Sequence, residues 1–409
     1  METTVCIIGA GPAGLMAAIS SATAGARTAV VDGNTAAGRK LLLTGGGRCN
    51  FTHQATPDEL VRAIGTSGRF LSYAFHKYPP AWVRDFFRQR GLESMVDQAG
   101  CVFPVTQRAS DVRDVLVRQA EQLGVRFYYG KRIESIKRRA DSFVVSAAGD
   151  VSVRSDKVII ATGGVSWPKT GSTGDGYKFA QELGHTIIPP KPSLVPLVTR
   201  ETWPASLAGT AMDNVRITAT VAGSKIVTTG PMIFTDDGIG GPAVLDISRF
   251  LTDYLPNEKE PIGVSIDLAP EVVKDDLERR LIDRLAANPN RKIASVLGDI
   301  APARLAKILC EQVGCSEVQA CQLTKDMRKK LVRLIKALPV SITGTRPMEE
   351  ATVTRGGVSL KEIDPKTMQS KTCPGLFFAG EILNVDGPCG GYNLQISWST
   401  AALAGISSL

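Results

Sequence analysis

The sequence predicts an α/β protein with a Rossmann-like dinucleotide-binding domain that a second, inserted domain interrupts. Three observations support this fold class. A strand, a glycine-rich turn and a helix follow one another at the N-terminus, further glycine clusters lie near both ends of the chain, and the residue pattern changes after three prolines at 189–192. The chain has 409 residues, which suits two or three domains of roughly 150 residues each.

The N-terminal unit is the first element. Its apolar runs predict a strand, a helix of small residues and a second strand at 5–8, 15–24 and 28–31. Gly9, Gly11 and Gly14 have the G-x-G-x-x-G spacing, which allows a tight turn, a close approach to a pyrophosphate and close helix–strand packing. Asp32 follows the second strand, where a carboxylate accepts hydrogen bonds from the adenosine ribose. This context predicts a bound dinucleotide.

The rest of the first domain alternates helices and short strands. Residues 58–90 have helical periodicity that two adjacent prolines interrupt, and helices are expected at 110–123 and 173–183, each followed by glycine. Strands are expected at 125–129, 133–137, 143–146 and 158–161.

The prolines at 189–192 predict a stiff, extended connection between domains. Beyond them we expect a β-hairpin at 215–221 and 225–229, a strand at 262–268 and an almost wholly helical stretch at 270–337. The predicted domains are therefore the N-terminal part of the dinucleotide-binding domain at 1–190, an inserted substrate or lid domain at 191–344 with a β part (191–269) and a helical part (270–338), and the C-terminal part of the first domain at 345–409.

The further glycine clusters identify the cofactor as FAD. They lie at 38–50, 159–164, 377–381 and 387–395. NAD needs only the first strand–turn–helix unit, whereas a longer cofactor that contacts both ends of the chain explains a discontinuous domain. No second G-x-G-x-x-G unit and no C-x-x-C pair is present, which argues against a built-in NAD(P)H domain of the disulfide-reductase type. NAD(P)H remains possible as a transient reductant.

Several longer stretches carry a family resemblance. They are GRKLLLTGGGRCNFT, CVFPVTQRASDV, ATGGVSWPKTGSTGDGY, PSLVPL, the GIGGPAVLDIS run and the segment from ATVTRGG to STAALAG. With these, the chain resembles the bacterial FAD flavoproteins of the aminoacetone-oxidase and 3-dehydro-bile-acid reductase type. The resemblance implies a two-dinucleotide-fold FAD domain, an inserted domain with a β-barrel-like part and a helical part, non-covalent FAD and a redox reaction on a small organic substrate.

Most of the residues expected to bind FAD belong to the glycine motif and the clusters. They are Gly9, Gly11, Pro12, Ala13, Gly14, Asp32, Lys40, Gly45, Gly46, Gly47, Arg48, Cys49, Asn50, Ile133, Ala161, Thr162, Gly163, Gly380, Glu381, Asp386, Gly391, Tyr392, Asn393 and Leu394. Three positions depart from the family pattern: His53 stands where Asn is usual, Asp236 where His is expected and Asn384 where Asp is expected.

Tyr392 and Arg355 are the candidate catalytic residues, because each lies in a glycine-rich stretch expected to face the flavin. A helix that begins at 391–393 would direct its positive end toward the flavin pyrimidine; the alternative is a tight entry to a core helix. Arg48 is a candidate counter-charge, or else the partner of a surface carboxylate. Trp167 is either a wall of the pocket or a core residue.

The predicted function is FAD-dependent hydride transfer between flavin N5 and a substrate carbon. In such a reaction the flavin itself performs the difficult chemistry. This would either reduce a C=C bond conjugated to a carbonyl or oxidise an amine. The alternative is a non-catalytic flavin-binding redox sensor or RNA-associated partner.

Net charge and the lengths of the apolar runs indicate which kinds of partner the chain binds. The net charge is +8, and the densest basic stretch, 325–336, has the pattern of the solvated face of an amphipathic helix. Without an aromatic platform or helix-turn-helix pattern, nucleic acid is an unlikely partner. No apolar run approaches the ~18 residues of a membrane span, and no signal peptide is evident. We expect a cytoplasmic enzyme with a small-molecule substrate and no metal.

Overall fold

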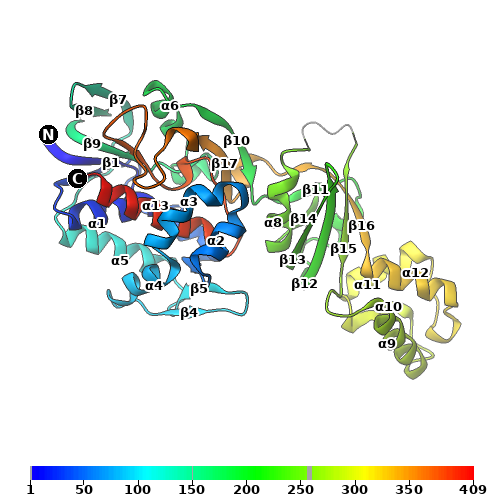
Figure 1. The fold of residues 1–409 in the computed structure, drawn as a ribbon. Coiled ribbons are helices and arrows are strands. Elements are labelled where there is room, and N and C mark those ends of the chain that lie inside the picture. The colour runs from blue at the N-terminus through cyan, green and yellow to red at the C-terminus, as the bar shows by residue number, and fades with distance from the viewer. Residues whose placement is uncertain (1, 150, 256–259) are drawn as a thin grey trace. The chain divides into compact units, whose positions relative to one another are not determined.

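The computed structural model describes residues 2–149, 151–255 and 260–409, which form two compact units (Figure 1). Unit 1 comprises Met1–Lys191 and Thr352–Leu409, and unit 2 comprises Pro192–Ala351. The second boundary lies later than residue 344 because Arg346 belongs to unit 2. Its backbone N–H donates to the carbonyl of Pro196 (3.0 Å), and its guanidinium pairs with Asp237 (2.5 Å).

A seven-stranded sheet forms the centre of unit 1, in the order β6-β2-β1-β9-β8-β7, with β18 also paired to β9. The strands are β1 (Glu2–Ile8), β2 (Thr28–Val31), β6 (Arg126–Tyr128), β7 (Ile133–Arg139), β8 (Ser142–Ala147), β9 (Val151–Ile160) and β18 (Leu376–Phe378). The β6, β2, β1, β9 and β18 pairings are parallel, and β7, β8 and β9 pair antiparallel. The buried apolar runs of β1 and β2 are typical of parallel strands covered on both faces.

Helices α1 (Pro12–Thr23), α5 (Ala109–Gln122) and α13 (Tyr392–Ser407) pack together against this sheet, with α1 in contact with the other two (Figure 1). Gly405 allows the close approach of α13, because a Cβ there would lie 2.6 Å from the carbonyl oxygen of Ala17. The two ends of unit 1 are therefore packed as one core.

The remaining elements of unit 1 surround this core. They are α2 (Pro57–Ile64), α3 (Gly68–Lys77), α4 (Pro80–Arg88), α6 (Asp175–Glu182), a three-stranded sheet of β3 (Thr52–His53), β5 (Cys101–Pro104) and β4 (Ser94–Val96), and the pair β10 (Ile187–Ser193) and β17 (Val353–Val358). The prolines at 189–192 thus lie in a strand of a two-stranded sheet, where an edge position tolerates a missing N–H.

Unit 2 contains a closed antiparallel barrel in the order β11-β14-β13-β12-β15-β16. Its strands are β11 (Leu197–Thr199), β12 (Ala211–Val221), β13 (Ser224–Thr235), β14 (Gly238–Gly240), β15 (Ile262–Asp267) and β16 (Leu338–Thr345). The β part therefore does not end at residue 269, because β16 follows the helices and closes the barrel.

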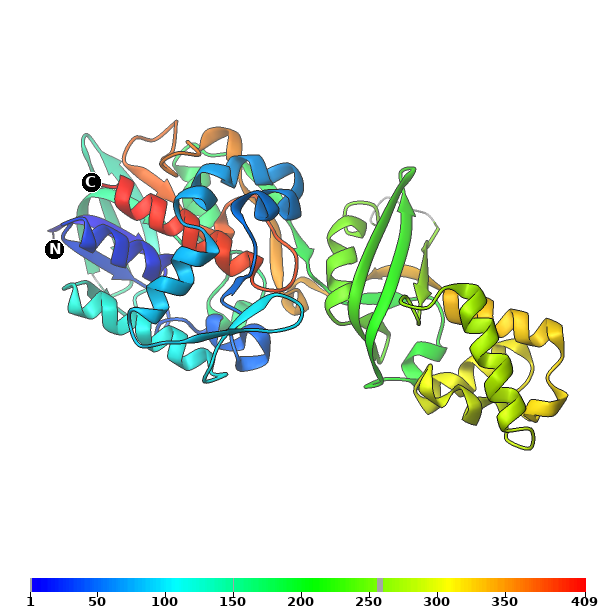
Figure 2. The ribbon, with the colours of Figure 1, turned by 60° about the horizontal axis from the view of Figure 1, so that its bottom comes forward.

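Helices cover the barrel on two sides. The short α7 (Trp203–Ser206) and α8 (Pro242–Leu251) pack on β13 and its neighbours, whereas α12 (Lys325–Lys336) contacts β15 and β16 (Figures 1 and 2). The helical part consists of α9 (Lys274–Ala287), α10 (Ile293–Val296), α11 (Ala303–Val313) and α12 (Lys325–Lys336). Among the described residues, no helix is long and apolar enough to cross a membrane.

Candidate functional site

In the turn between β1 and α1, two of the three motif glycines are closely packed and the third borders open space. Gly9 has φ +101°, and a Cβ there would lie 2.7 Å from the carbonyl oxygen of Ala161. A Cβ on Gly14 would lie 1.8 Å from the carbonyl oxygen of Gly9. At Gly11, by contrast, no atom lies within 4 Å of an added Cβ. Gly11 is also the N-cap of α1 and supplies no side-chain cap, so the helix N-terminus is open to an anion.

Asp32 holds the loops at the end of β2. Its carboxylate accepts hydrogen bonds from the backbone N–H groups of Ala10 and Asn34, both at 2.6 Å. An ionised carboxylate has about four lone-pair sites, so acceptor capacity remains for ribose hydroxyls. Ile133, the predicted contact at the start of β7, is buried.

A 3₁₀ segment at Leu41–Gly47 carries the second glycine cluster. Gly45, Gly46 and Gly47 all have positive φ, and no atom lies within 4 Å of a Cβ added at Gly46. Among the described residues, no carboxylate pairs with Arg48. Its Nε donates to the carbonyl of Gly45 (3.1 Å), and its guanidinium lies 4.6 Å from the Phe103 ring centroid. This segment therefore offers a bare backbone surface beside a fixed positive charge.

Cys49 and Asn50 complete that segment. Burial raises the pKa of the Cys49 thiol to about 12, so this thiol is neutral near pH 7 and unsuited to nucleophilic chemistry. Asn50 lies against Gly45, where an added Cβ would be 3.3 Å from its Oδ1.

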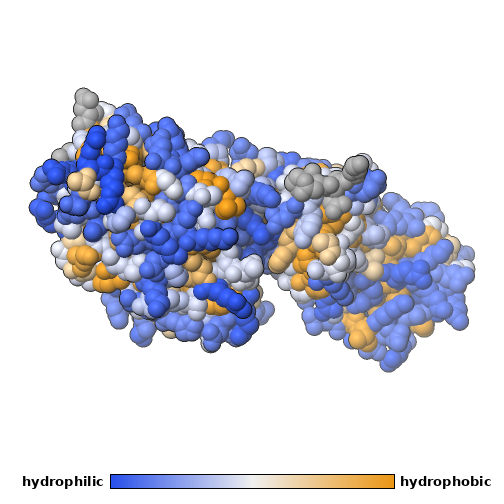
Figure 3. Space-filling view, turned by 45° about the horizontal axis from the view of Figure 1, so that its top comes forward, coloured by the Kyte–Doolittle hydropathy of each residue, from blue (hydrophilic) through white to orange (hydrophobic). Residues whose placement is uncertain are grey.

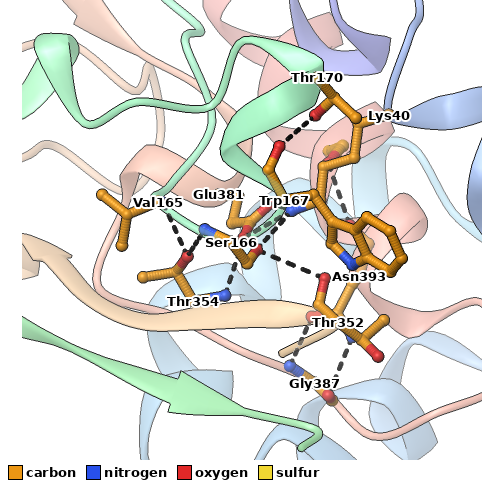
Figure 4. Close-up of polar contacts among 11 residues, drawn as sticks. Lys40, Val165, Ser166, Trp167, Thr170, Thr352, Thr354, Glu381, Gly387 and Asn393 are labelled. Atoms are coloured by element: carbon orange, nitrogen blue, oxygen red, sulfur yellow. Dashed lines mark hydrogen bonds and ion pairs between the residues drawn. The ribbon is translucent and has the colours of Figure 1, made fainter. Parts of the chain in front are cut away.

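A polar network joins four distant segments of unit 1 (Figure 4). Lys40 Nζ lies 2.8 Å from Glu381 Oε2 and donates to Ser166 Oγ at 2.7 Å. Glu381 Oε1 also accepts hydrogen bonds from the Thr354 N–H (2.8 Å) and from Ser166 Oγ (3.1 Å). Two predicted FAD contacts, Lys40 and Glu381, are thus bonded to each other. The sequence reasoning missed Ser166, although it lies within the ATGGVSWPKTG stretch.

The N-terminus of α13, like that of α1, has a glycine N-cap and no side-chain cap. Gly391, with φ +98°, is its N-cap and provides no side-chain cap, and an added Cβ would lie 2.2 Å from the carbonyl oxygen of Thr52. Asn393 turns its side chain back to the preceding loop, where its amide donates to the carbonyls of Gly387 (2.9 Å) and Pro388 (3.2 Å) (Figure 4). The backbone amides of this first turn carry the positive end of the helix dipole.

Tyr392 is the first residue of α13, and its ring stacks on His53, with centroids 4.6 Å apart. His53 Nδ1 lies 3.0 Å from the carbonyl oxygen of Gly390. The family departure at His53 therefore contacts the predicted catalytic tyrosine. The departure at Asp236 lies elsewhere, exposed in unit 2 between β13 and β14.

Arg355 lies in β17, and its Nε is 3.8 Å from Oδ1 of the buried Asp386. The next residue, Gly356, packs against β10, because an added Cβ would lie 2.5 Å from the carbonyl oxygen of Pro189. Trp167 has φ +54° and is 39% exposed, so it is not a core residue of unit 1.

Thr162 follows β9, and its hydroxyl is buried with no hydrogen-bond partner among the described residues. An unsatisfied buried hydroxyl costs about 1–3 kcal/mol, so this position suits a ligand that supplies the missing bond. Like Thr162, every residue predicted to bind FAD or act in catalysis lies in unit 1.

The comparisons with known proteins agree with this geometry. The family model described as "HI0933-like protein Rossmann domain" matches residues 3–407. The chain belongs to the HI0933-like family. It is 32% identical to the 3-dehydro-bile acid delta(4,6)-reductase of Clostridium scindens, in an alignment that covers 98% of this chain and 97% of that protein.

The chain is also similar to a second curated relative and to solved structures. The chain is 31% identical to the ribosomal RNA dihydrouridine synthase of Escherichia coli, over 97% of this chain and 95% of that protein. Among solved structures, it is similar in fold to 3-ketosteroid delta1-dehydrogenase from Sterolibacterium denitrificans, with a TM-score of 0.54 and 11% identity over 99% of this chain and 98% of that one. It is also similar in fold to a flavocytochrome c3 fumarate reductase, with a TM-score of 0.51 and 16% identity over 100% of this chain and 78% of that one.

This HI0933-like protein is an FAD-dependent oxidoreductase, and the expected family and α/β fold class with its barrel are confirmed. Its residues fit FAD on structural grounds. The open space at Gly11 admits a pyrophosphate, and Thr162 has a buried hydroxyl in need of a partner. The uncapped turn at Gly391 offers backbone amides.

Proposed function

We propose that this chain reduces a carbon–carbon double bond conjugated to a carbonyl group. The observation that carries this reaction class is the pair of equally similar relatives. A delta(4,6)-reductase of a 3-dehydro compound and a synthase of dihydrouridine both imply the addition of two hydrogens to such a double bond. Bound FAD, once it has been reduced by two electrons, would supply the hydride from its N5 atom and return to the oxidised form. NAD(P)H is the proposed reductant that restores it.

The chain's own residues supply the remaining parts of the reaction. We assign proton donation at the substrate α-carbon to the Tyr392 hydroxyl. A positioned general acid contributes about 10²–10⁴ in rate. The stack on His53 restrains the tyrosine ring. Hydride addition at the β-carbon moves negative charge to the carbonyl oxygen, and the Arg355 guanidinium is suited to stabilise it. The positive end of α13 suits the negative charge of a reduced flavin ring.

The FAD sites predicted from the sequence remain part of this proposal. The open space at Gly11 and Gly46 supports them, and so does the start of α13 at Gly391, where no side chain caps the helix. The network of Lys40 and Glu381 supports an indirect role for both residues, in which they fix the loops that carry the glycines.

The experiment is anaerobic turnover with purified, FAD-loaded protein. NADH, NADPH or dithionite is the reductant, and the acceptors are a steroid enone, free uridine and uridine-containing RNA. Reduction of at least one acceptor, seen by mass spectrometry as a gain of two hydrogens, is the expected result. An aminoketone panel with oxygen is the control. Turnover confined to that panel would instead establish amine oxidation, and a bound flavin with no turnover of any acceptor would indicate a sensor.

A further inference from the structure

The positive charge of unit 2 is concentrated in its helical part. Residues 270–337 contain 14 Lys and Arg against 9 Asp and Glu, a net charge of +5 within a chain of +8. Residues 192–269 contain 5 Lys and Arg against 9 Asp and Glu, a net charge of −4. The two parts of unit 2 therefore have opposite character, which the net charge of the whole chain conceals.

Within the helical part, α12 is the most one-sided helix. It carries six basic residues and a single acid, Asp326, whereas α9 carries four of each sign. Lys325, Lys329 and Arg333 recur every four residues, so they share one face of α12, and all three are exposed. With a rise of 1.5 Å per residue, neighbouring charges lie about 6 Å apart along the helix axis.

Of the three remaining basic residues of α12, Lys330 is also exposed, whereas the other two form ion pairs. Arg328 Nε lies 3.1 Å from Glu278 Oε1, and Lys336 Nζ lies 2.7 Å from Asp267 Oδ2. No such ion pair occurs at Lys325, Lys329 or Arg333 among the described residues. Like charges four residues apart weaken a helix, and a surface shaped only for solubility intersperses both signs. The three-residue stripe is thus an unneutralised row of cations.

The stripe is held in place by the apolar face of the same helix. Leu331, Val332 and Ile335 are fully buried, and the Thr324 side chain caps the helix by accepting a hydrogen bond from the Met327 N–H (3.2 Å). In Figure 3 the helical part of unit 2 shows a largely hydrophilic surface. A membrane-binding helix needs an exposed apolar face beside its cations, and α12 has already buried its own.

We propose that the stripe Lys325–Lys329–Arg333 binds the phosphate backbone of an RNA substrate. The inference rests on the proposed function, because the uracil base of an RNA is one of the acceptors that such a reductase takes. A row of cations without base-reading groups suits backbone phosphates, which position a nucleic acid without reading its sequence. This surface lies on the helical part of unit 2, whereas the chemistry is assigned to unit 1, so docking and reduction are separable.

The test measures binding rather than turnover. FAD-loaded protein is titrated into fluorescently labelled oligouridine and into purified ribosomal RNA at several salt concentrations, without reductant. The test variant is K325Q/K329Q/R333Q, because glutamine keeps helix propensity close to that of lysine and arginine. The matched control is K137Q/R139Q/R154Q, which removes the same charge from exposed positions on β7 and β9 of unit 1.

We expect the stripe variant to bind at least tenfold more weakly at moderate salt. Each lost phosphate contact lowers the slope of log affinity against log salt by about 0.7 for a single strand, so three contacts lower it by roughly 2. The control variant should keep both the affinity and the slope. FAD content, circular dichroism and reduction of a small enone or free uridine should be unchanged in both variants, which separates lost docking from a folding defect or failed chemistry.

Two results would overturn the assignment. One is equal weakening in the stripe and control variants, because that would show attraction to net charge alone. The other is wild-type RNA affinity in the stripe variant together with lost binding to vesicles of phosphatidylcholine and phosphatidylserine, which would make the partner a membrane surface. If no acceptor is reduced but RNA binding follows the stripe, the proposed reaction fails and the docking surface stands.

Discussion

Replacing Gly11 by alanine tests whether the open space at the start of α1 is the pyrophosphate site. The backbone at Gly11 is extended, with φ −76° and ψ −175°, which alanine adopts freely. Because no atom lies within 4 Å of the new Cβ, the apoprotein should lose no stability. It should gain about 0.4–1 kcal/mol through the less flexible unfolded chain.

FAD binding should change in the opposite direction. A methyl group forced into a filled site costs about 1–3 kcal/mol, which corresponds to roughly 5–150-fold weaker FAD binding at 1.4 kcal/mol per tenfold. FAD titration of the apoprotein by flavin fluorescence measures the affinity, and urea denaturation of the apoprotein measures the stability.

Two further glycines calibrate this result. Gly14→Ala should destabilise the apoprotein itself, because its Cβ would lie 1.8 Å from the Gly9 carbonyl oxygen. Gly263→Ala, which also points into open space but lies in β15 of the barrel, should give a similar small gain in stability and leave FAD affinity unchanged. Wild-type FAD affinity in Gly11→Ala would refute the assignment of the pyrophosphate to this turn.

Three other perturbations give distinct readouts. Asp32→Ala should weaken FAD binding about 10–150-fold, since a hydrogen bond to a charged group is worth about 1.5–3 kcal/mol; unchanged affinity in the same titration would remove the ribose contact. Tyr392→Phe should lower turnover by roughly 10²–10⁴ with FAD content intact, and an unchanged rate would transfer the proton-donor role to Arg355. Burial lowers the pKa of His185 below its usual 6.5, although the nearby Glu362 opposes this. As the pH falls, His185 is therefore protonated in the unfolded chain before it is protonated in the folded protein. The urea midpoint should therefore decrease below about pH 6.5, and His185→Asn should flatten that dependence.

Local patterns in the sequence predict those parts of the fold that local interactions determine. The G-x-G-x-x-G turn, the short buried strands and the helices with glycine after their C-termini are local features. The sequence predicts the strand at 151–160 only from residue 158, where its continuous buried apolar run begins, whereas the first half is positioned by antiparallel pairing with β8. Closure of the barrel by β16 depends on a partner strand more than seventy residues away, which no local pattern indicates.

The candidate site shows the same division. Spacing alone predicts the motif glycines, whereas the bonds that Lys40 makes with Ser166 and Glu381 cross 126 and 341 residues of sequence. Arg48 was expected as a counter-charge or as the partner of a surface carboxylate. The ring that it covers, Phe103, belongs to β5 of a separate small sheet, so the contact arises only from tertiary packing.

The packing of α1 against α13 sets the order in which this protein can mature on the ribosome. During translation, α1 emerges before the whole of unit 2, while β18 and α13 emerge after it. Until then β9 has β1 on one side of residues 158–160 but lacks β18 on the other, and the apolar surface of α1 lacks α13. Such exposed strand edges and apolar faces promote aggregation of partly folded chains. Unit 2 has no such dependence, because every strand of its barrel is complete once residue 345 has emerged. The nascent protein should therefore pass through a stage with a finished barrel and an unfinished flavin domain, at which chaperone binding matters most.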